Sequence, residues 1–120
     1  MKKLIFFSIC LTFTLGSFAK TAIDNFKPAE IKKLMINAAY WQLENPRHEL
    51  YDWTNATFYA GISAAYRTTK DEKLKKAMLE MGEKNEWKPG PRISHADDQA
   101  IAQTYIDLYR ITKDKRYITG

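Results

Sequence analysis

The sequence predicts an all-α protein built from helical hairpins. Three observations support this prediction. No stretch of the 120 residues alternates polar and apolar side chains over a useful length, four segments repeat apolar residues with the helical period, and segments with one apolar face alternate with segments that are apolar nearly all round. Such alternation is typical of stacked hairpins in which one helix of each pair faces the interior and the other faces water.

The first and third segments have a single apolar face and are predicted to lie against water. The first begins at Pro28, a favoured first-turn residue, and ends at Asn45-Pro46, because a residue before proline is pushed out of helical geometry. Its stripe comprises Ile31, Leu34, Met35, Ala38 and Ala39. The third spans about residues 71–86. Its narrow stripe comprises Leu74, Ala77, Met78 and Met81.

The second and fourth segments are predicted to be enclosed by other helices. The second runs from about Asp52 or Thr54, either of which can cap it, to Tyr66. The fourth runs from about Ala96 to Ile111. A fifth segment begins near residue 114. The motif aromatic-Arg-x-Thr-Lys-Asp occurs at 66–71 and again, 43 residues later, at 109–114. This weak internal repeat has the length of a helix pair.

Residues 1–19 are predicted to be a signal peptide. Lys2 and Lys3 precede an almost wholly apolar run at 4–15, and Ser17-Phe18-Ala19 provides a small-x-small cleavage site after Ala19. The run is shorter than the roughly 20 residues that span a bilayer. We therefore expect an exported protein, periplasmic or secreted, with no membrane segment after cleavage. Cys10 lies in the leader, so the mature chain, from about residue 20, has no cysteine and no internal disulfide.

The net charge of +5 does not by itself indicate a nucleic-acid partner, because the basic residues are scattered along the chain. The densest polar cluster is His95-Ala96-Asp97-Asp98-Gln99, at the start of the fourth helix. It can be a helix cap, with Ser94 as N-cap and the carboxylates in the first turn, or a site at the mouth of a cavity. Adjacent helical residues point about 100° apart, so only one aspartate can point into a cavity and the other should bond locally.

Two further groups fall near the predicted helix ends. Trp53 and Asn55 open the second helix. Trp53 is either a flat surface on which a sugar ring can stack or a side chain of the core, and Asn55 offers a hydrogen-bond donor and an acceptor. The connection at 86–92 is either an ordinary solvated loop or a cover that brings Trp87, Lys88 or Arg92 over the same mouth. A metal site is not favoured, because His48 is the only other histidine.

These motifs together resemble a known family. They are similar to the N-terminal part of glycoside hydrolase families 88 and 105, the unsaturated glucuronyl and rhamnogalacturonyl hydrolases. The similar motifs are Trp53-x-Asn55-x-x-x-Tyr59-x-Gly61, Asn85-x-Trp87, His95-Ala96-Asp97-Asp98-x-x-Ile101-x-Gln103-x-Tyr105 and Thr112-x-Asp114-x-x-Tyr117-Ile118. The resemblance covers about residues 30–118. It implies a partial (α/α)6 toroid of alternating inner and outer helices, with residues 20–120 as its truncated N-terminal part.

The resemblance also implies a substrate and a mechanism. Family members remove a 4,5-unsaturated uronic acid from an oligosaccharide derived from pectin or a related polymer, without a metal or cofactor, by protonating C4 and adding water at C5. By motif position Asp98 matches an important family aspartate and Asp97 is the second candidate, while Trp53, Asn55, His95, Gln99 and Trp87 are the expected substrate-binding residues. The acid needs a raised pKa, which an apolar wall near Trp53 or the neighbouring carboxylate could supply.

The chain departs from the family pattern in one respect. The family's principal acid/base aspartate lies on a later inner helix that this sequence does not contain, so we expect the chain alone to be inactive. The alternative function is a non-catalytic array of helical hairpins that holds a glycan or a peptide.

Overall fold

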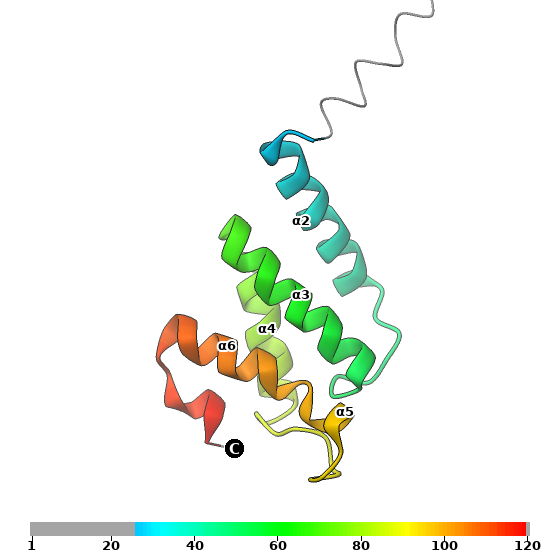
Figure 1. Cartoon of the computed structure of the whole chain (residues 1–120), viewed down its shortest axis with the longest axis vertical. Helices are drawn as coiled ribbons and strands as arrows, with labels where there is room; N and C mark the ends of the chain where they lie inside the picture. Colours follow the sequence, from blue (N-terminus) through cyan, green and yellow to red (C-terminus); the bar gives the residue numbers. More distant parts are fainter. Residues whose placement is uncertain (1–25, 120) are drawn as a thin grey trace, which may run out of the picture.

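The computed structural model describes residues 26–119, and within that range it is all-α, with no strand. The elements are α2 (Pro28–Glu44), α3 (Trp53–Thr69), α4 (Glu72–Lys84), α5 (Ala96–Gln99), α6 (Ala102–Thr112) and the 3₁₀-helix η1 (Lys115–Ile118). Figure 1 shows that α2 and α3 form an antiparallel hairpin, and that α3 and α6 both run away from the lower right of the view. The predicted signal peptide lies outside the described residues.

The ends of α2 follow the sequence prediction, but its buried face differs. Pro28 starts the helix, and the N–H of Asn45 bonds to the carbonyl of Gln42 at its end. Ala39 is buried and Met35 packs on the core, whereas Ile31, Leu34 and Ala38 are exposed. The prediction that these three face the core is wrong, because among the described helices α2 packs mainly on α3 and only one side of it is covered.

Helices α3 and α4 begin at aspartate caps. The N–H of Thr54 donates to Asp52 over 2.8 Å, and the N–H groups of Lys73 and Leu74 donate to Asp71. Helix α4 ends at Lys84, two residues before the predicted end. The stripe predicted for α4 is buried as expected at Leu74, Met78 and Met81.

The internal repeat is visible in the backbone. Lys70 ends α3 with φ 59°, and Lys113 ends α6 with φ 64°, so both adopt the left-handed conformation that closes a helix. The next residue in each copy, Asp71 or Asp114, caps the following helix by accepting the N–H two residues on. The repeated sequence therefore encodes the same turn twice.

The predicted fourth helix is interrupted. It divides into α5 and α6, because the N–H groups of Ala100, Gln103 and Thr104 bond three residues back rather than four. His95, and not Ser94, precedes α5, and its side chain makes no capping bond. A single helix over 96–111, and Ser94 as its cap, were therefore wrong predictions.

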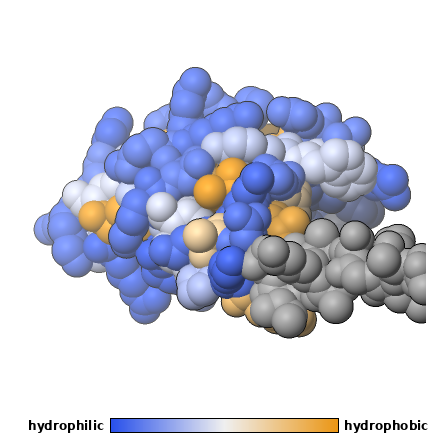
Figure 2. Space-filling view, turned by 90° about the horizontal axis from the view of Figure 1, so that it is seen from above, coloured by the Kyte–Doolittle hydropathy of each residue, from blue (hydrophilic) through white to orange (hydrophobic). Residues whose placement is uncertain are grey.

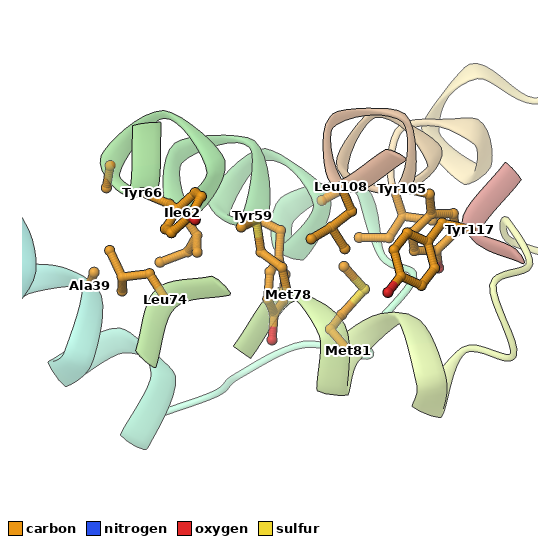
Figure 3. Packing of buried hydrophobic residues seen from close by; sticks show 13 residues of the cluster. Ala39, Tyr59, Ile62, Tyr66, Leu74, Met78, Met81, Tyr105, Leu108 and Tyr117 are labelled. Carbon is orange, nitrogen blue, oxygen red and sulfur yellow. The ribbon is translucent and has the colours of Figure 1, made fainter. Parts of the chain in front are cut away.

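The core lies between α3 and α6 on one side and α4 on the other (Figure 3). Its buried apolar residues are Ala39, Ala56, Tyr59, Ile62, Ala65, Tyr66, Leu74, Met78, Met81, Ile101, Tyr105, Leu108 and Tyr117. Figure 3 shows Leu74 and Ile62 at one end of this row, and Met81, Leu108 and Tyr105 at the other. One continuous core thus joins α3, α4 and α6.

Helix α3 packs on α2, α4 and α6, yet it is not enclosed all round. Its side that carries Thr57, Gly61 and Ala64 is exposed, because no described helix covers it. Elsewhere hydrophobic residues emerge at several places on a mainly hydrophilic surface (Figure 2). The enclosure predicted for α3 is therefore only partial within residues 26–119.

Candidate functional site

The two polar clusters predicted from the sequence lie at the same end of the molecule. Trp53 opens α3, and α5 carries the His95–Gln99 cluster; both helices begin in the lower right of Figure 1. Within residues 26–119 no hydrogen bond or ion pair joins Trp53 or Asn55 to that cluster. The clusters share an end of the fold without direct polar contact.

Asp98 is the most strongly bonded side chain of the cluster. Its side chain is only 7% exposed. The backbone N–H of Arg92 donates to Oδ2 over 2.8 Å, Nε of Arg92 lies 3.1 Å from both carboxylate oxygens, and Nη2 donates to Oδ1. The carbonyl of Asp98 accepts the N–H of Gly90 over 2.8 Å. Asp98 therefore ties the 90–92 loop to α5.

This bonding corrects the expectation of a raised pKa. The Arg92 guanidinium, and then its backbone N–H, hold the pKa of Asp98 below its usual range, and they outweigh the opposing effect of burial. At neutral pH Asp98 is therefore a carboxylate. An apolar wall or a second carboxylate would have raised its pKa, but the bonds from Arg92 decide the direction.

Asp97 and His95 are more open. The side chain of Asp97 is 54% exposed and that of His95 is 42% exposed. Nδ1 of His95 is nevertheless buried and has no hydrogen-bond partner. It lies 3.6 Å from Oδ1 of Asp98 and 3.8 Å from Oδ2 of Asp97. The structure thus brings these three predicted residues together, with Asp98 bonded locally and Asp97 facing outward.

Gln99 and Trp87 share a cavity of about 230 Å³. It is lined also by Pro89, Ala102, Tyr105, Ile106, Tyr117 and Ile118. The ring of Trp87 stacks on Tyr117 at 4.2 Å between centroids, and the amide of Gln99 donates to the carbonyl of Ile93. Trp87 therefore packs as a partly buried wall.

At the start of α3, Trp53 and Asn55 differ in their availability. The side chain of Asn55 donates to the carbonyl of Leu50 over 3.1 Å and so fixes the α2–α3 connection. Trp53 is 51% exposed and leaves its ring open to solvent. Of these two predicted contacts, Trp53 has the freer surface.

Sequence reasoning missed the role of Arg92 and did not consider Gly90. An ideal Cβ on Gly90 would lie 2.7 Å from Cβ and Cγ of Asp98, so only glycine fits there without movement. The 86–92 connection was interpreted either as an ordinary solvated loop or as a cover that brings Arg92 over the mouth, and its spacing did not indicate a bond to Asp98.

Two further properties concern the part of the chain that the structure describes. No helix in it is long and apolar enough to cross a bilayer. Nor does it group three or more His, Cys, Asp or Glu side chains as a metal ion would need.

Comparison with known proteins decides the family. The profile described as Glycosyl Hydrolase Family 88 matches residues 23–120, which is most of the chain. The chain belongs to glycosyl hydrolase family 88. The family resemblance that the His-Ala-Asp-Asp run and its neighbouring motifs suggested is thus confirmed.

A curated relative of this family 88 chain comes from Formosa agariphila and is named unsaturated 3S-rhamnoglycuronyl hydrolase. The two are 39% identical over 90 residues, which is 73% of this chain and 23% of the relative. The chain therefore spans about a quarter of that protein's length. No solved structure matches the chain.

Proposed function

We propose that this family 88 chain is part of a hydrolase that removes a 4,5-unsaturated uronic acid from an oligosaccharide of pectin (rhamnogalacturonan) or a related polymer. The observation that supports the proposal most is the 39% identity to a relative whose name specifies an unsaturated glycuronyl substrate. The family match over residues 23–120 is consistent with it.

The proposed reaction is hydration of a vinyl ether. A carboxylic acid donates its proton to C4 of the double bond, water adds its oxygen at C5 and gives a proton back to the carboxylate, and the resulting hemiketal collapses and releases the aglycone. The donor must hold its proton near neutral pH. Asp98 does not, because Arg92 lowers its pKa. The donor is therefore a different carboxyl group, which the family resemblance implies to lie on a later inner helix.

In this proposal the chain supplies one wall of the sugar site. The exposed ring of Trp53 stacks on a sugar face, and the cavity between Trp87 and Gln99 takes a neighbouring group. His95 and Asn55 provide hydrogen-bonding groups at the same end. A metal or cofactor is not part of the reaction as proposed.

The test is turnover of an unsaturated uronyl disaccharide, followed by the loss of ultraviolet absorbance from its double bond. We expect no turnover by the 120-residue chain and clear turnover by a longer product of the same reading frame. Binding of the disaccharide by both, with turnover by neither, would instead support the alternative of a non-catalytic glycan-binding module.

We also propose export of the protein through its N-terminal segment. N-terminal sequencing of the protein recovered from the periplasm or the medium should begin at Lys20. Recovery only from the cytoplasm, with Met1 or Lys2 intact, would contradict export.

A further inference from the structure

The starting observation is a chain of contacts from Arg92 through Asp98 to His95. Arg92 uses its backbone N–H and its guanidinium on both oxygens of Asp98, a bidentate geometry that fixes a carboxylate in orientation as well as position. Gly90 closes the other side of Asp98, where no Cβ fits. The carboxylate is therefore held from two directions before any ligand arrives.

The second observation is the buried nitrogen of His95. Nδ1 is buried without a partner while 42% of the side chain is exposed, so the exposed part of the residue lies away from Nδ1. Oδ1 of Asp98 lies 3.6 Å from Nδ1, closer than Oδ2 of Asp97 at 3.8 Å and a little beyond a hydrogen bond. A small rotation of the ring closes that gap and satisfies a nitrogen that is otherwise left without a partner.

We propose that Arg92 and Asp98 are positioning residues for His95: Arg92 fixes Asp98, Asp98 accepts the Nδ1 proton of His95, and the outer edge of the imidazole contacts the sugar. The part that concerns the sugar rests on the proposed function. The part that concerns Arg92, Asp98 and His95 does not, and it can be tested without substrate.

The chemical consequence is a fixed tautomer. A neutral imidazole carries its proton on one nitrogen, and the hydrogen bond made by that nitrogen decides which one it is. With the proton on Nδ1, Nε2 presents a lone pair that accepts a hydrogen bond from a sugar hydroxyl. The charged groups that face His95 are Asp97, Asp98 and, behind Asp98, Arg92. Asp97 competes for Nδ1 at 3.8 Å, so it needs a variant of its own.

The experiment is ¹⁵N NMR of the histidine side chains at mildly alkaline pH, where the shifts distinguish the Nδ1–H from the Nε2–H tautomer. His48, the only other histidine, lies exposed in the α2–α3 connection and provides an internal reference. We expect Nδ1–H for His95 in the wild type. In Arg92→Gln and Asp98→Asn we expect the tautomer of His95 to change while the His48 signals stay in place.

The chain offers a matched control in Arg116. Its backbone N–H, Nε and Nη2 bond to the carboxylate of Asp114 in the same pattern that Arg92 uses with Asp98, but on η1. Arg116→Gln should leave His95 unchanged. Arg92→Lys keeps the charge but loses the bidentate geometry, so we expect a smaller change in the tautomer of His95 than in Arg92→Gln. If circular dichroism shows that Asp98→Asn is unfolded, Arg92→Lys replaces it.

Three results would overturn the proposal: an Nε2–H tautomer for His95 in the wild type, an unchanged tautomer in folded Asp98→Asn and Arg92→Lys, or a change in Asp97→Asn alone.

The contact between His95 and the sugar is tested by adding an unsaturated uronyl disaccharide and measuring its binding. His95→Ala should weaken its binding about tenfold, the loss of one hydrogen bond. A disaccharide that binds no variant refutes the proposed function and the sugar contact, while the tautomer result still decides the positioning role.

Discussion

The hydroxyl of Ser63 on α3 donates a 2.8 Å hydrogen bond to Oδ2 of Asp107 on α6, between residues 44 positions apart in the chain. Ser63 is fully buried and Asp107 nearly so. Arg67, one turn beyond Ser63, reaches the same oxygen at 2.9 Å. Helices α3 and α6 are thus joined by a polar contact as well as by the core.

Ser63→Ala should therefore lower the free energy of unfolding by about 1–3 kcal/mol, because a buried carboxylate loses a donor that water cannot easily replace. Urea unfolding at neutral pH measures the change. Ser94→Ala is the control, since Ser94 is exposed in a loop, and its effect should stay within about 0.5 kcal/mol. Equal effects of the two substitutions would mean that the contact contributes nothing.

Stability should fall on acidification below about pH 4, the ordinary range of aspartate in an unfolded chain. Burial acts to raise the pKa of Asp107, but the hydrogen bonds from Ser63 and Arg67 outweigh it and lower that pKa in the folded protein. A lowered pKa contributes stability above the unfolded value, and that contribution is lost as the pH falls through the folded value. Urea midpoints measured from pH 6 to pH 2 should decrease, and Ser63→Ala should decrease less. A constant or rising midpoint would contradict this.

Two glycines should respond oppositely to alanine. A Cβ on Gly82 would lie 2.1 Å from the ring of Trp87, whereas a Cβ on Gly61 meets nothing within 4 Å. Gly82→Ala should destabilise the protein by about 1–3 kcal/mol through overpacking. Gly61→Ala, in a helix interior, should stabilise it by about 0.5–1 kcal/mol. Thermal unfolding of both variants tests the pair, and a neutral Gly82→Ala would mean that Trp87 moves freely.

The exposed stripe of α2 should tolerate polar substitution. Leu34 is 56% exposed, whereas Leu74 on α4 is fully buried. Leu34→Gln should change the free energy of unfolding by less than about 0.5 kcal/mol, while Leu74→Ala should lower it by about 2–5 kcal/mol. Chemical unfolding of the two variants measures both changes in the free energy of unfolding. A large loss in Leu34→Gln would mean that the stripe is covered in solution.

Local signals made the helix ends predictable. Pro28, Asn45-Pro46 and Asp52 each act on the backbone within a few residues, and α2 and α3 begin or end where these residues indicate. The interruption at 100–101 could not be predicted, because alanine and isoleucine are ordinary helix residues and the shift to three-residue bonds has no local sequence signal.

The candidate site was predictable in position but not in chemistry. Helix starts place His95, Asp98 and Trp53 at one end, as the sequence indicated. The lowered pKa of Asp98 depends instead on how the 90–92 loop folds back, and a turn-rich run does not specify that path. The buried side of α2 was missed because, among the described helices, mainly α3 covers it, and the sequence does not show on which side α3 packs.

The repeated turn offers a last test, because two lysines occupy left-handed positions that favour glycine. Lys70 and Lys113 end α3 and α6 with φ of 59° and 64°, and their N–H groups close onto Tyr66 and Tyr109. Lys70→Gly and Lys113→Gly should each raise the free energy of unfolding by up to about 1 kcal/mol, since the left-handed conformation is unfavourable for a residue with a Cβ. Lys76→Gly, in the middle of α4, is the control and should lower it by about 1 kcal/mol. Because the two turns are equivalent, similar gains are expected at both and their effects should add in the double variant. A gain at one lysine and a loss at the other would show that the copies of the repeat are not equivalent in energy.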